Sequence, residues 1–180
     1  MSDAPVGPGW RADVRDTVVR ILADRVRAVN GRVHRARVWP VTSKPALLVY
    51  GYAEKKELIN AGGWQHQFRV TANMVVRVLA EGAIAERAED DCESLAGQVE
   101  RAILQAPDLF SPSLPPDRGI WRCAAVDTQI SAEQKERAVE VEATMQFQLV
   151  WEETFTMAEP VTAECADVEV GTHDLSIPTA

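Results

Sequence analysis

The chain has 180 residues, of which 46% are hydrophobic and 26% are charged, and this balance excludes disorder throughout. Its length favours one domain with one sizeable core. No apolar run approaches the roughly 20 residues of a membrane helix, and residues 1–9 lack the basic and apolar stretches of a secretion signal. We therefore expect a protein made in the cytoplasm with no membrane partner.

The charge of the chain is unevenly placed. The formal net charge of −8, which disfavours a general nucleic-acid binder, combines +7 over residues 1–80 with −15 over residues 81–180. Three interpretations stay open: copies that attract one another head to tail, two different partners sorted by the sign of their charge, or an uneven surface without functional meaning. The three cysteines, an odd count, predict reduced thiols.

The first residues of the chain predict a flexible segment followed by a helix. Residues 1–10, rich in proline and glycine, are typical of a flexible N-terminal arm. A helix is expected over residues 13–29, because apolar side chains recur there at three- and four-residue spacing: Val14, Val18, Leu22, Val26 and Val29. Asn30-Gly31 is a helix stop, since both residues tolerate the left-handed conformation.

Three strands are expected next. Alternation predicts a strand over residues 32–39, ended by Pro40, and the apolar run 46–50 predicts a buried strand. The charged stretch 54–63, which ends in two glycines, is typical of an exposed hairpin loop or flap. A long strand follows with one buried row: Trp64, His66, Phe68, Val70, Ala72, Met74, Val76 and Val78.

The C-terminal half predicts a helix and two strands. The helix spans residues 86–105, with Leu95, Val99, Ala102 and Ile103 inward, and a stiff loop over 106–119 follows it. A strand over 120–130 and a turn over 131–137 lead to the last strand. Its apolar row alternates with an acidic and amide row that includes Glu140, Glu142, Gln146 and Gln148.

These elements predict an α+β (α/β) fold. One mostly antiparallel or mixed sheet of about five strands carries two helices on one face, while its second face is polar. The domain spans residues 11–156. Residues 157–180 form a C-terminal extension that either pairs with a neighbouring copy by strand addition or lies on its own domain.

No motif indicates catalysis. The sequence lacks a phosphate loop, a dinucleotide fingerprint, a nucleophile elbow and HExxH, and its histidines and cysteines lack metal-ligand spacing. We therefore predict no catalytic, cofactor or metal site and no enzyme. The alternative is a small-ligand or enzymatic module that uses Asp90, Asp91 and His66 in a pocket.

One family resemblance adds to this interpretation. The Asn-Gly stop is followed by GRVHRARVWPVTSKPALLVYGY, and later come the helix DDCESLAGQVERAIL and the strand VEVEATMQFQLVWEETF. Over residues 11–156 this order resembles the tail terminator proteins of long-tailed bacteriophages and prophages (minor tail protein U-like, or tail completion proteins). The extension 157–180 lies beyond the usual end of such proteins.

The resemblance implies a structural virion protein at the head–tail junction. It implies a homohexameric ring that caps the tail tube, stops its polymerisation and offers a surface to the head-completion protein of the neck, while genomic DNA passes through the lumen without specific binding. The nearest alternative is another neck or tail-to-head joining protein. Within this frame, Glu140, Glu142, Gln146 and Gln148 face the lumen or the tube. The predicted interface residues are Arg35, Arg37, Trp39, Lys55, Lys56 and Trp64.

Overall fold

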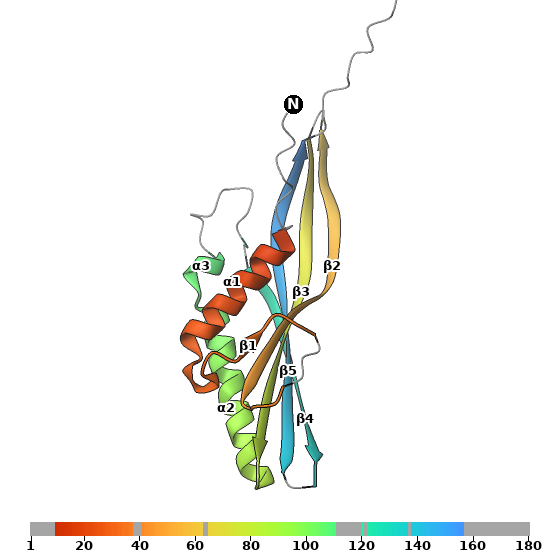
Figure 1. The fold of residues 1–180 in the computed structure, drawn as a ribbon. Helices are drawn as coiled ribbons and strands as arrows, with labels where there is room; N and C mark the ends of the chain where they lie inside the picture. The colour runs from red at the N-terminus through yellow and green to blue at the C-terminus, as the bar shows by residue number, and fades with distance from the viewer. Residues whose placement is uncertain are drawn as a thin grey trace, which may run out of the picture.

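The fold is one sheet covered by helices on one face (Figure 1). The computed structural model describes residues 10–37, 41–62, 65–110, 120, 122–136 and 138–156. Its elements are α1 (Trp10–Arg25), a 3₁₀ turn η1 (Arg27–Val29), β1 (Val33–His34), β2 (Ala46–Gly62), β3 (Gln65–Gly82), α2 (Ala85–Leu104), α3 (Pro107–Phe110), β4 (Arg122–Gln134) and β5 (Val139–Thr156). None of the helices among these residues is long and apolar enough to span a bilayer.

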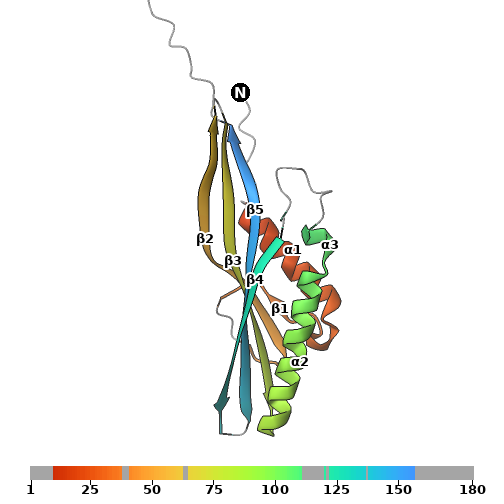
Figure 2. The same cartoon turned by 180° about the vertical axis from the view of Figure 1, so that it is seen from behind.

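The sheet has the strand order β1-β2-β3-β5-β4. β1 is parallel to β2, and the other neighbours are antiparallel. The predicted α+β class, with a mixed sheet of about five strands and two long helices on one face, is therefore confirmed (Figure 2).

The core lies between the helices and the sheet. The predicted inward rows of α1, α2 and β5 are buried, and Trp151 at the end of the β5 row is only 1% exposed. α2 lies close to the sheet because several of its buried residues are small, and a Cβ atom added at Gly82 would come within 3.2 Å of the Ala88 Cβ. We call this side of the sheet the helix face and the opposite side the outer face. Because side chains alternate along a strand, Glu142 and Arg77 lie on the outer face.

The N-terminal region differs from the prediction in two places. The first helix ends at Arg25 and a 3₁₀ turn follows, while the stop is confirmed because Asn30 (φ 49°) and Gly31 (φ 73°) are left-handed. Of the strand predicted over 32–39, Val33–His34 is a strand, whereas residues 35–37 are not, and residues 38–39 lie outside the described residues. The chain then turns onto the outer face, where the Arg77 guanidinium donates a hydrogen bond to the Arg37 carbonyl at 3.2 Å.

The stretch predicted as a loop over 54–63 is also different. β2 continues to Gly62 and pairs with β3 as far as Gln65, with register shifts between Gly51 and Ala53 and between Leu58 and Asn60. Charged side chains are tolerated in this half of β2 because most of them lie exposed to solvent. The expected loop is therefore the edge strand of a long hairpin.

Strands β2, β3 and β5 extend together beyond α1 and form a projection (Figures 1 and 2). We call this part, residues 53–62, 65–73 and 148–156, the arm.

Two further predictions need adjustment. Residues 131–134 continue β4 and are not part of a turn, because they pair with β5 as far as Val139. The expected loop after α2 begins with the short helix α3. The predictions for residues 1–9, for the rest of that loop and for the extension 157–180 lie outside the described residues.

Candidate assembly surface

The outer face carries a tightly bonded pair of opposite charges. Arg77 on β3 donates from Nε to Glu142 Oε1 at 2.6 Å and from Nη2 to Glu142 Oε2 at 2.5 Å. Thr144 Oγ1, two residues along β5, donates to Glu142 Oε1 at 2.9 Å. These hydrogen bonds favour the charged forms, so the Arg77 guanidinium lowers the pKa of Glu142 and the carboxylate raises the pKa of Arg77.

A second ionic cluster lies at the end of the sheet where β2 begins. Lys44 Nζ contacts Glu140 at 2.5 Å and Glu81 at 3.2 Å, and the lysine side chain is only 12% exposed. Burial alone would lower the pKa of Lys44, but the hydrogen bonds to Glu140 and Glu81 outweigh it and raise that pKa. The same contact lowers the pKa of Glu140.

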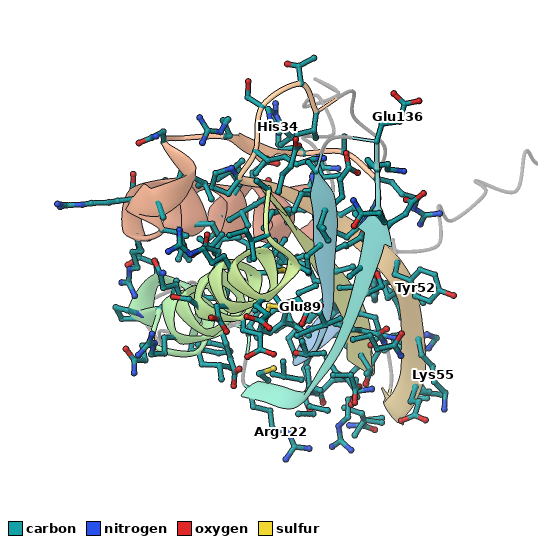
Figure 3. All side chains as sticks on the ribbon, turned by 90° about the horizontal axis from the view of Figure 1, so that it is seen from below. His34, Tyr52, Lys55, Glu89, Arg122 and Glu136 are labelled. Carbon is teal, nitrogen blue, oxygen red and sulfur yellow. The ribbon has the colours of Figure 1, made fainter. Side chains whose placement is uncertain are left out.

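Two tyrosine rings of β2 lie against an arginine next to these charged clusters. The Arg37 guanidinium lies over the Tyr50 ring at 5.2 Å from its centroid and over the Tyr52 ring at 5.9 Å. Figure 3 shows Tyr52 and Lys55 projecting from β2 on the side away from the helices. Such cation–π contacts hold the Arg37 side chain against β2.

The predicted row of acids and amides does share the outer face. Glu140, Glu142, Gln146 and Gln148 alternate with the buried row of β5 and are all partly exposed. The two acids are not a free negative stripe, because Lys44 and Arg77 compensate them. The second face, predicted to be polar, also has apolar parts, since Leu48 and Val75 are buried on it.

The structure separates the predicted basic contact residues. Arg35 lies next to α1, where its Nη1 contacts Asp16 Oδ2 at 2.7 Å. Arg37 lies on the outer face, and Lys55 and Lys56 lie on the arm. Trp39 and Trp64, predicted with them, lie outside the described residues.

The two lysines of the arm differ in their surroundings. Lys56 on the helix face contacts Glu153 of β5, and its ammonium lies 4.9 Å from the centroid of the Phe155 ring. Lys55 on the outer face has a side chain that is 74% exposed, and its Nζ contacts Glu57 at 2.6 Å. The Lys55 ammonium lowers the pKa of Glu57. Lys55 is therefore the basic residue most available to a partner among these four.

The arm exposes large apolar side chains that the sequence prediction missed. Leu58 is 54% exposed and Phe155 is 48% exposed, and the rings of Phe155 and Phe68 meet edge to face at 5.7 Å. These residues share the helix face of the arm, beyond the reach of α1. The sequence around Leu58 is mostly charged or polar and gives no apolar row, so it offers no signal for this surface.

The residues of the alternative enzymatic reading do not meet. Asp90 and Asp91 are exposed on α2, just after the Gly82 end of β3, whereas His66 is near the opposite end of that strand. Sixteen residues of strand separate the two ends, which corresponds to roughly 50 Å. Within the described ranges, no three His, Cys, Asp or Glu side chains come together as a metal site.

One buried cysteine and one cavity lie apart from these charged clusters. Cys92 is buried against the sheet, and burial raises the pKa of its thiol to about 11, so it behaves as a small hydrophobic side chain. A cavity of about 270 Å³ lies between α1 and the base of the arm. Its wall combines apolar side chains such as Val14, Met74 and Trp151 with the polar side chains of Tyr52, Glu54 and Asn73.

The comparisons with known proteins give a distant structural likeness. No family model matches the chain, and no curated protein matches it. Among solved structures, a matching chain belongs to the virion of a native gene transfer agent particle. That chain is 15% identical, the match covers 83% of this chain and 100% of the other, and the TM-score is 0.43.

Proposed function

We propose that the chain is a structural protein of a phage-type particle, a tail terminator at the head–tail junction of the virion. Six copies close into a ring on the end of the tail tube. The ring stops polymerisation of the tube protein and offers its other side to the head-completion protein of the neck. No bond is made or broken in this function, which works by the fit of surfaces.

The observation that carries the proposal is the arm. Three strands project beyond the helices, so the side chains of Leu58 and Phe155 stay substantially exposed. The base of the arm is buried at Val70 and Trp151, but its far part is a narrow sheet whose apolar side chains stay exposed. Exposed apolar patches of this kind mark contact with other proteins. The arm therefore supports a role in assembly, with the tube protein or a neighbouring copy as its partner.

The outer face suits the lumen of such a ring. Its acids are held by Arg77 and Lys44, and Gln146 and Gln148 add neutral amides. A charge-compensated wall neither binds phosphate strongly nor repels it strongly, so DNA can pass without specific binding. We assign Glu140, Glu142, Gln146 and Gln148 to this wall.

The ring contacts follow from the separated basic residues. Lys55 and Lys56 on the arm face the tube or the next copy, and Arg35 and Arg37 lie on the body where a neighbour would pack. Trp39 and Trp64 remain proposed contacts. Such contacts are head to tail, and they give a closed ring only when the rotation between copies closes.

The test is to image particles assembled without this protein. A terminator predicts tail tubes of uncontrolled, excessive length that lack heads in negative-stain images, and supplying the intact chain restores normal tails. Headless tails of normal length would contradict the proposal and indicate a joining protein of the neck. Normal, infectious particles would exclude both.

A further inference from the structure

β4 is the edge strand of the sheet at the end opposite β1. It pairs with β5 over Arg122–Gln134, and in the described part of the chain nothing pairs with its other side. All of its residues except Cys123 and Val126 are exposed. Natural edge strands are usually blunted by proline, lysine or central bulges, but β4 contains neither residue and its one register shift lies near its start, between Cys123 and Ala125.

The opposite edge of the sheet is open over the arm. β1 covers β2 only at Leu47 and Leu48. From Tyr50 to Gly62, the edge of β2 that points away from β3 therefore has no strand beside it among the residues described.

The directions of these two edges allow copies to follow one another. Each step from β2 to β3, from β3 to β5 and from β5 to β4 is antiparallel, so β2 and β4 run in opposite directions. When copies are related by rotation about an axis roughly along the strands, β4 of one copy lies antiparallel to β2 of the next. Pairing of β4 with another β4 would instead need a twofold axis and would end at a dimer.

We propose that β4 of one copy pairs with the arm portion of β2 in a second copy, which continues the sheet around the ring. This inference rests on the proposed ring and names the contact that closes it. The partner is a second copy of this chain because its free edge has the direction that β4 requires.

The face on which each side chain lies, together with its charge, defines the register between β4 of one copy and β2 of the next. Asp127 on β4 and Lys55 on β2 both lie on the outer face, and both are exposed. Pairing them places opposite charges side by side across the new strand pair. Within one copy, Lys55 is paired with Thr71 of β3, whereas Asp127 is aligned through Gln146 of β5 with Val75 of β3. These two positions on β3 are four residues apart. Pairing Lys55 with Asp127 therefore offsets neighbouring copies by about 13 Å along the strands. A closed sheet accommodates such an offset as strand tilt.

Disulfide cross-linking tests this contact in the full-length protein. Cys123→Ala and Cys165→Ala leave Cys92, which is buried, as the only native thiol. Lys55→Cys with Asp127→Cys then brings two cysteines to the predicted pair. Mild oxidation is expected to give a ladder of cross-linked multimers that ends at the ring. To allow for a small shift in register, Gln129→Cys and Ser131→Cys, which share the outer face, are each tested with Lys55→Cys.

Matched controls separate the outcomes. Thr128→Cys with Lys55→Cys lies one residue away but on the helix face, so it should cross-link at least fivefold less. A dimer formed by Asp127→Cys alone would show β4 pairing with itself and overturn the inference. A ring of six by native mass in which no outer-face pair cross-links would overturn the inference and leave the proposed function standing, whereas a monomer would overturn both.

Discussion

At the residue scale, the Arg77–Glu142 pair stabilises the outer face and lies on the wall that we propose for the lumen. Glu142 accepts hydrogen bonds from Arg77 and Thr144, and it lies on the face assigned to the lumen. The sequence predicted the position of this acid from the alternation of β5. It did not predict the partner, because Arg77 is 65 residues away and only strand register brings the two together.

Replacing Glu142 with glutamine should lower the free energy of unfolding by about 1–2 kcal/mol at pH 7, because a charge-assisted, partly buried pair is lost. The folded-state pKa of Glu142 is depressed, so its contribution is present above the unfolded value of about 4.3 and is lost as the pH falls through the lowered pKa. Urea unfolding at pH 7 and in acid measures both effects.

The matched control for this variant is Glu133→Gln, whose side chain is 71% exposed in its ion pair with Lys135. Its effect should stay within about 0.5 kcal/mol at both pH values. Equal losses for the two variants, or a loss at Glu142 that persists in acid, would show that the Arg77 pair does not supply the stability assigned to it.

At the scale of elements, the arm is the part of the fold that the sequence identified least well. The apolar periodicity of α1, α2, β3 and β5 predicted their existence and inward faces, because those elements bury one face against a core. Along residues 54–62 most side chains stay exposed on both faces, so no apolar row distinguishes strand from loop. Pairing with β3, a long-range interaction, decides the structure there.

The arm leads to a direct prediction. Leu58→Asp should reduce the fraction of protein in rings at least tenfold and lengthen tail tubes in complemented particles, because a charge cannot be buried against a partner without compensation. The monomer should keep its stability, since Leu58 is 54% exposed. Native mass spectrometry and negative-stain images measure the two effects.

Ile84, which is also 54% exposed but lies at the start of α2, provides the control. Ile84→Asp should assemble as the unmodified protein does. If both substitutions impair assembly equally, or if neither does, the arm is not the contact surface that the proposal requires.

At the scale of the whole molecule, the sequence predicted the fold class more fully than the surface. Amphipathic patterns follow from burial within one chain, so they are visible in one sequence. Contacts between copies leave no such pattern in one sequence. The four basic residues predicted as contacts with other copies or with the tube lie in three separate places. Which strands form the two edges of the sheet follows only from the strand order of the described residues.

The most direct measurement is the native mass of the purified protein, alone and with tail tube protein. The account predicts a closed assembly of six 19.8 kDa chains that associates with the end of the tube. A species with the mass of one chain under both conditions would contradict it.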